Sequence, residues 1–254
     1  MYVIWAGERL DGDLAVLTGA CCKKAEEWAD MPMVLHTHQQ FAAPGSAGFW
    51  ILRFAASFER ILSHVWHYLS DWRKHCPLGS GAVAGSSLGV DRRVQARELG
   101  FEGPSPNGLE STSCRDECLE FLHLASQTAL HLQALATDMV LFAQTPLGWV
   151  RYPDEFATGS SMMPNKMNPD AMELLRAEAN AIHAAEHHAL LLMKGLPTGY
   201  NRDLQCIKPI VRETSERLHD LCDMAATFIT QLEFDPAKLL ASMKQGAVEA
   251  TLAM

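Results

Sequence analysis

A serine-rich turn followed by a lysine and an asparagine is the first group of residues whose types suit chemistry. The residues from Gly159 to Asp170 read Gly-Ser-Ser-Met-Met-Pro-Asn-Lys-Met-Asn-Pro-Asp. Asn168 is a good N-cap and Pro169 is favoured at a first helical position, so we expect a helix to begin there. Free N–H groups at a helix start attract a carboxylate or phosphate, and Lys166 adds a positive charge. A plain capped loop would use the same residues, so both interpretations stay open on physical grounds.

This segment resembles the signature of the fumarase/aspartase superfamily, G-S-S-x-M-P-x-K-x-N-P, at every fixed position. Other segments narrow the resemblance to the argininosuccinate lyase family. Thr37-His38 with Gln40 and Pro44 resembles its T-H-x-Q-x-x-x-P element. Pro77 to Gly85, followed by Val90-Asp91-Arg92, resembles its P-L-G-S-G-A-x-A-G element. Tyr200 to Gln205 with Lys208 resembles its Y-N-[KR]-D-L-Q-x-x-K element.

The resemblance implies elimination of fumarate from argininosuccinate to give arginine, with no metal and no organic cofactor. It also implies an all-α fold, a bundle of long helices that forms a homotetramer. In that family each active site takes segments from three subunits. Elimination requires removal of an unactivated proton beside a carboxylate, so a base, an acid and a carboxylate clamp are all needed.

By resemblance, Ser160 is the catalytic serine, and its hydroxyl must be activated by loop amides and by Lys166. His38 is the second acid/base residue, and Glu173 is the carboxylate that pairs with it. The sequence leaves open which of Ser160 and His38 removes the proton. Substrate-binding roles carry over to Thr37, Asn168, Tyr200, Gln205 and Lys208.

Several positions depart from the family pattern, which usually has Gln and Lys in the signature loop, two acidic residues before the final lysine, and Tyr and Arg near the histidine. Here those positions are Asn165, Met167, Cys206, Ile207, His36 and Phe41. The departures lower the charge complementarity to substrate. They keep two alternatives open: a non-catalytic relative, and another superfamily lyase that acts on a different succinyl compound.

Helical periodicity dominates the rest of the chain. Apolar residues recur at three- and four-residue intervals over 46–75, 113–143, 169–195 and 209–232, and a shorter helix is expected over 13–30. Ser113 to Asp116 reads as a capping box for the second of these helices. The absence of strand signals between the runs favours an all-α bundle.

The expected organisation is a central helical domain over 1–234 and the start of a truncated C-terminal helical domain over 235–254. The family's first substrate-binding segment, S-R-N-D-Q, has no match, so we expect a chain truncated at both ends. The helices over 113–143 and 169–195 carry apolar residues on more than one face, which favours helices shared between subunits.

Composition excludes several classes of protein. The 254 residues are 48% hydrophobic, enough for a large core, and the net charge of −9 gives no basic surface for nucleic acid. No apolar run is long enough for a membrane span, and the N-terminus lacks the features of a secretory signal. Seven scattered cysteines suit reduced thiols, so we expect a cytoplasmic protein.

Two other patterns carry little weight. His183 to His187 fits the zinc-protease pattern H-x-x-E-H, but no third ligand is identifiable. The glycine-rich segment from Gly79 to Gly85 follows a predicted helix, whereas a dinucleotide-binding turn follows a strand.

Overall fold

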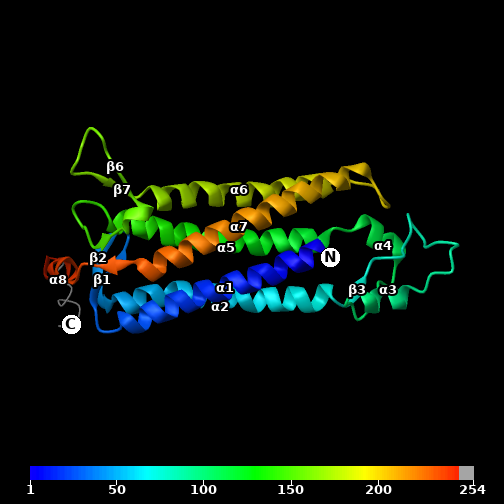
Figure 1. Ribbon diagram of the computed structural model, residues 1–254, viewed down its shortest axis with the longest axis horizontal. Coiled ribbons are helices and arrows are strands. Elements are labelled where there is room, and N and C mark those ends of the chain that lie inside the picture. The colour runs from blue at the N-terminus through cyan, green and yellow to red at the C-terminus, as the bar shows by residue number, and fades with distance from the viewer. Residues whose placement is uncertain (246–254) are drawn as a thin grey trace. The chain divides into compact units, whose positions relative to one another are not determined.

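The protein is mostly helical in the computed structural model, which describes residues 1–245. Its long helices are α1 (Tyr2–Glu27), α2 (Ala47–Trp72), α5 (Asp116–Phe142), α6 (Asp170–Met193) and α7 (Ile207–Gln231). The short helical elements are α3 (Arg92–Glu98), α4 (Gly108–Ser113), α8 (Pro236–Gln245) and the 3-10 turns η1 (Asp154–Phe156) and η2 (Arg202–Cys206). The all-α prediction is confirmed (Figure 1). No helix among the described residues is both long and apolar enough to cross a membrane.

Short strands connect the helices in pairs, which the sequence did not predict. They are β1 (Pro32–Thr37), β2 (Gln40–Ser46), β3 (His75–Cys76), β4 (Gly103–Pro104), β5 (Val150–Arg151), β6 (Thr158–Gly159), β7 (Met167–Asn168) and β8 (Glu233–Phe234). The pairs β1–β2, β5–β8 and β6–β7 are antiparallel, and β3–β4 is parallel. In β1–β2 the register shifts after Leu35, because His36 pairs with Phe41 and leaves Ala42 as an extra residue.

The chain divides into two compact units, and each long helix contributes a part to both. Unit 1 comprises residues 1–12, 61–127 and 181–219, and unit 2 comprises 13–60, 128–180 and 220–254. The predicted domain boundary at residue 235 stays a prediction, and residues 246–254 of the predicted second domain lie outside the described residues.

Unit 1 has a hydrophobic core and a small satellite cluster. Val65, Phe121, Leu122 and Leu218 are almost completely buried. The satellite cluster consists of Cys76, Ala96 and Phe101, with Ile4 packed against it. It lies under the loops that connect α2 with α5.

Unit 2 has an aromatic core. Trp28 packs edge-on against Phe234 with ring centroids 4.9 Å apart, and Phe142 contacts Trp149 at 5.0 Å. Such pairs add about 0.5–1.5 kcal/mol beyond the burial of their area. Trp149 also donates its indole N–H to Ser242 Oγ at 2.7 Å, which holds α8 against the rest of unit 2.

Helix α1 is longer than predicted, since it begins at Tyr2 and not near residue 13. Ala6 and Leu10 continue the buried stripe of Leu14 and Leu17 toward the N-terminus. The sequence did not predict a helix over this segment because Gly7 lies in it, and glycine disfavours a helix by about 1 kcal/mol relative to alanine. Its lack of a side chain has a packing reason, since a Cβ there would lie 2.8 Å from the Tyr68 ring.

Candidate functional site

The signature segment forms a hairpin in unit 2 whose tip carries Ser160 and Lys166. Thr158 pairs with Asn168, and Gly159 pairs with Met167. Ser160 and Lys166 follow these pairs on the two sides of the loop. The backbone N–H of Met163 donates to Ser160 Oγ at 3.1 Å, and Lys166 N–H donates to the Met163 carbonyl at 2.9 Å. Ser160 is half-buried, whereas Lys166 and the loop between the two residues are exposed to solvent.

Side chains at the base of this hairpin fix it to helix α6. Asn168 Nδ2 donates to Thr158 Oγ1 at 3.5 Å, and Thr158 Oγ1 donates to the Asp170 carboxylate. Asp170 is the first residue of α6, where a negative charge is favourable. The predicted N-cap at Asn168 is therefore wrong by one residue. The Pro169 carbonyl accepts the N–H groups of Met172 and Glu173 at 3.1 Å, and Asn168 pairs across the hairpin.

His38 lies at the tip of the second hairpin of unit 2, directly after Thr37 at the end of β1. His38 has φ 51° and Gln39 has φ 60°. Two successive positive φ values are typical of a type I′ turn, the connection that suits the twist of a two-residue hairpin. Both hairpins precede the start of a long helix, β1–β2 before α2 and β6–β7 before α6 (Figure 1).

A cavity of about 680 Å³ lies beside the His38 turn and is lined by residues of β1, α2 and α5. His36 and Gln39 reach it from the hairpin, and Asp138 reaches it from α5. His36 packs on Phe41 and Trp149 with ring centroids 5.3 and 5.2 Å apart. Burial lowers the pKa of His36, and the nearby Asp138 carboxylate acts in the opposite direction. The neutral imidazole is thus part of the aromatic packing that supports the turn.

Glu173 is exposed on the first turn of α6. In the described part of the chain, it makes no hydrogen bond or ion pair with His38. The predicted pairing of these two residues therefore does not exist within one copy. It stays a prediction for an assembled protein.

Tyr200, Gln205 and Lys208 form a separate group in unit 1. Gln205 Nε2 donates to the Tyr200 hydroxyl across the η2 turn. Lys208 follows in the first turn of α7 and is exposed. Asn201, for which the sequence predicted no role, holds the preceding turn by donating to the carbonyls of Pro197 and Gly199 at 2.8 and 3.0 Å.

Helix α6 separates the two groups along the chain. Asn168 precedes its first residue, Asp170, and Tyr200 follows its last residue, Met193. The predicted site residues therefore fall into two groups in the sequence, one before α6 and one after it.

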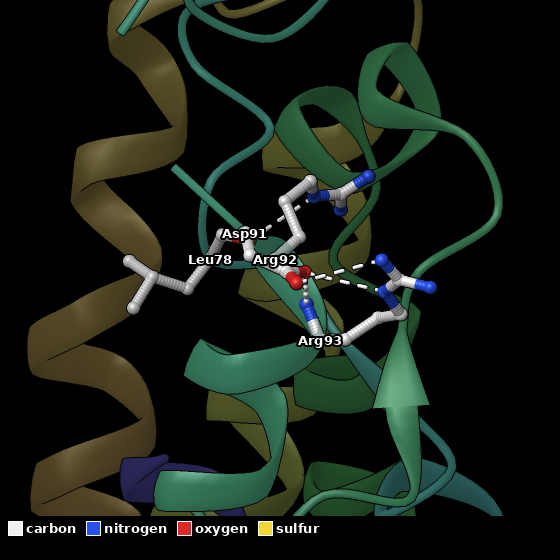
Figure 2. Close-up of polar contacts among 4 residues, drawn as sticks. All are labelled: Leu78, Asp91, Arg92 and Arg93. Atoms are coloured by element: carbon white, nitrogen blue, oxygen red, sulfur yellow. Dashed lines mark hydrogen bonds and ion pairs between the residues drawn. The ribbon is translucent and has the colours of Figure 1, made fainter. Parts of the chain in front are cut away.

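The glycine-rich segment is organised by Arg92, a residue for which the sequence predicted no role. Its guanidinium donates to the Leu78 carbonyl at 3.3 Å and to the hydroxyls of Ser80 and Ser105 at 3.0 and 2.9 Å. Asp91 caps α3 by accepting the Arg93 N–H at 2.9 Å, and its carboxylate also faces the Arg93 guanidinium (Figure 2). These contacts account for the Val-Asp-Arg run after the glycines.

Two of the H-x-x-E-H residues, His183 and Glu186, contact α5 side chains in unit 1. His183 Nδ1 is 2.6 Å from Ser126 Oγ, and Glu186 Oε1 is 2.9 Å from His123 Nδ1. Within residues 1–245, no group of three or more His, Cys, Asp or Glu residues is arranged to hold a metal ion.

Comparison with known proteins gives matches over most of the chain. A lyase family model matches residues 2–183. Argininosuccinate lyase from Koribacter versatilis is 36% identical over 94% of this chain and 52% of its own length. The enzyme of the same name from Acidobacterium capsulatum is 35% identical over all of this chain and 52% of its own length. The chain thus spans about half the length of the curated relatives it matches.

Solved structures show the same fold at low sequence identity. A class II fumarase from Schistosoma mansoni superposes with a TM-score of 0.86 at 20% identity, over 95% of this chain and 56% of that one. A fumarate lyase:delta crystallin structure from Brucella melitensis gives a TM-score of 0.87 at 20% identity, over 98% of this chain and 56% of that one.

Proposed function

Because the chain belongs to the lyase family whose model covers residues 2–183, we propose that it acts as an argininosuccinate lyase. The observation that carries the proposal is the hairpin that places Ser160 and Lys166 on the two sides of one exposed loop at the start of α6. Relatives named argininosuccinate lyase at 32–36% identity support this choice of substrate.

The proposed reaction breaks one C–N bond and forms one C=C bond. A base removes a proton from the carbon beside a succinyl carboxylate, and the electron pair then forms the double bond. The guanidino nitrogen leaves and receives a proton from an acid, so the products are fumarate and arginine. Ser160 and His38 supply the base and the acid between them, and Glu173 orients the imidazole.

Charge stabilisation in this proposal comes from the lysines. The negative charge that develops on the succinyl carboxylate in the transition state needs fixed positive partners. Lys166 supplies one at the hairpin and Lys208 supplies another at the start of α7. Thr37 and Asn168 bind the succinyl part, and Tyr200 and Gln205 hydrogen-bond the amino-acid end.

Assembly of such a site requires more than one copy of the chain, in this proposal a homotetramer. This follows the resemblance, since in that family each active site takes segments from three subunits. Large apolar side chains on the long helices support burial between copies, since Phe49 is 64% exposed and Leu174 63%.

The test is the release of fumarate, followed by ultraviolet absorbance, from argininosuccinate and from a panel of other succinyl amines. We expect argininosuccinate to be the best substrate and Ser160→Ala to lose at least a thousandfold in kcat. Ser86→Ala is the matched control, because Ser86 Oγ accepts a local N–H from Leu88 at 3.2 Å as Ser160 Oγ does from Met163.

Two results would contradict the proposal. Turnover of a different succinyl compound with none of argininosuccinate would overturn the substrate and keep the reaction class. No turnover of any compound by a folded oligomer would favour a non-catalytic relative.

A further inference from the structure

A groove of about 650 Å³ lies in unit 2 and shares Arg53 and Asp138 with the cavity beside the His38 turn. Its walls come from α2, α5 and α6. Arg53 projects from α2 and Arg176 from α6, and α5 supplies residues between Leu130 and Asp138. None of the nine residues predicted to be catalytic or substrate-binding lines it.

Among the described residues, neither guanidinium group of the groove forms an ion pair, although the charge of Arg53 lowers the pKa of Asp138. In the region that the structure describes, no carboxylate lies within 4.0 Å of Arg53 or Arg176. Asp138 is the single acidic residue of the lining, and it accepts the Trp50 indole N–H at 3.0 Å. Even when Asp138 is ionised, one positive charge remains in excess, in a chain whose net charge is −9.

Neutral donors add to the groove. Gln133 Nε2 donates to Asn180 Oδ1 at 2.9 Å and to the Arg176 carbonyl at 3.1 Å. Because its oxygen is engaged, the Asn180 amide offers its N–H groups as the remaining polar edge. The lining is therefore rich in donors and poor in acceptors.

The field at His131 agrees with this excess of positive charge. Burial lowers the pKa of His131, and Arg53 and Arg60 lower it further. Both arginines disfavour the imidazolium form, Arg53 from within the groove and Arg60 from outside its lining.

We propose that this groove binds a small dicarboxylate, with one carboxylate on Arg53 and the other on Arg176. The arginines lie on different helices, which bond to α5 through Trp50–Asp138 and Gln133–Asn180. Separated charges on the ligand suit separated guanidinium groups, and each planar guanidinium matches a carboxylate in two-point geometry. The proposal is independent of the proposed function, because its residues are not part of the predicted catalytic loops.

The test follows the imidazole of His131 by NMR in the whole protein, with its signal assigned by comparison with His131→Asn. Succinate, inorganic phosphate and sodium chloride are titrated separately at equal ionic strength. We expect succinate to raise the pKa of His131 in a saturable way, because a bound dianion cancels the charges that disfavour imidazolium. Phosphate should do so more weakly, and chloride should have no saturable effect.

Variants assign the effect to the groove. Arg53→Gln and Arg176→Gln should each weaken succinate binding at least tenfold, while Arg53→Lys retains part of it. Arg151→Gln is the control, since Arg151 is an exposed arginine of the same unit outside the groove. Without ligand, Arg53→Gln should itself raise the pKa of His131, which shows that the field is present.

Three outcomes would overturn the proposal. The first is the absence of any saturable change at His131 with succinate. The second is an equal loss of affinity in Arg151→Gln and Arg53→Gln. The third is tighter binding of phosphate than of succinate, which would replace the dicarboxylate with a compact oxyanion.

Discussion

At the scale of single residues, His38 and Gln39 stand out by their backbone conformation. They are the non-glycine residues with positive φ in the described part of the chain. In this region the Cβ crowds the following carbonyl, at about 1–2 kcal/mol per residue. The strands on both sides hold the turn closed, so the orientation of the His38 imidazole depends on the hairpin register.

Gln39→Gly is therefore expected to stabilise the protein by about 1 kcal/mol, because glycine adopts φ 60° without the Cβ conflict. Denaturant unfolding followed by circular dichroism measures the change. Gln40→Gly is the control, since Gln40 lies in β2 and glycine weakens a strand. Equal destabilisation by both variants would contradict the prediction.

Glu117 in unit 1 gives a prediction on pH. Burial raises the pKa of its carboxyl above the ordinary value of 4.5. At a pH between the ordinary and the raised pKa of Glu117, the folded protein binds more protons than the unfolded chain. The free energy of unfolding therefore falls as pH rises through that interval.

Glu117→Gln should remove this loss. We expect the variant to be more stable than the parent at neutral pH by on the order of 1 kcal/mol, and the difference to narrow below pH 4.5. Unfolding free energies measured across the pH range test it. Glu120→Gln, at an exposed position, should change the stability by less than about 0.5 kcal/mol.

At the scale of elements, the predictions of the long helices succeeded where apolar periodicity was continuous. The helix predicted over 46–75 is α2, and those predicted over 113–143, 169–195 and 209–232 are α5, α6 and α7. The observed ends of these helices differ from the predicted ones by at most three residues, and α7 begins two residues earlier than predicted. The all-α class followed from the same pattern.

The hairpin β1–β2 was missed for a definable reason. Its two-residue turn is His38-Gln39, whereas the recognisable type I′ signal is Asn-Gly or Asp-Gly. The burial pattern of β1 is also irregular, because Met33 and Val34 are both buried. Neither the turn residues nor an alternation of buried and exposed side chains therefore indicated that β1 is a strand.

The predicted capping box at Ser113 is wrong as well. Ser113 is the last residue of α4, and its hydroxyl donates back to the Leu109 carbonyl at 2.7 Å. Cys114 Sγ accepts the Asp116 N–H at 3.3 Å, where the box would have used a serine. Two helices meet at this point, which a one-helix motif does not describe.

The candidate site was predictable as a set of residues but not as a geometry. The motif identified Ser160, Lys166 and Asn168, and the structure adds the hairpin that places the first two on opposite sides of a loop. The support from Asp170 and Thr158 depends on the register of β6 and β7. Local spacing does not encode such a register.

The bond between α2 and α5 gives a prediction at this scale. Burial raises the pKa of Asp138, and the hydrogen bond from Trp50 lowers it. Trp50→Phe keeps the ring and removes the donor, so we expect a further rise in this pKa and a loss of about 1–3 kcal/mol. NMR titration and denaturant unfolding measure them. Trp66→Phe is the control, because Trp66 makes the same kind of bond to Asp11 at an exposed position.

At the scale of the whole molecule, a site shared between copies predicts complementation. Ser160→Ala and Lys208→Met should each be inactive alone. After joint unfolding and refolding at equal amounts, roughly a quarter of the sites would draw both intact residues from different copies and recover activity. Recovery in the refolded mixture but not in a simple mixture supports shared sites. No recovery, with oligomers formed, would place both residues in one copy.

Phe234 also has a consequence for the time course of folding. It covers Trp28 and Trp50 with ring centroids 4.9 and 5.8 Å away, and β8 pairs with a strand more than eighty residues earlier in the chain. During synthesis, both tryptophans emerge from the ribosome long before this cover does. Until residue 234 is available, the nascent chain exposes an incomplete aromatic cluster, and it needs protection from aggregation for most of its translation.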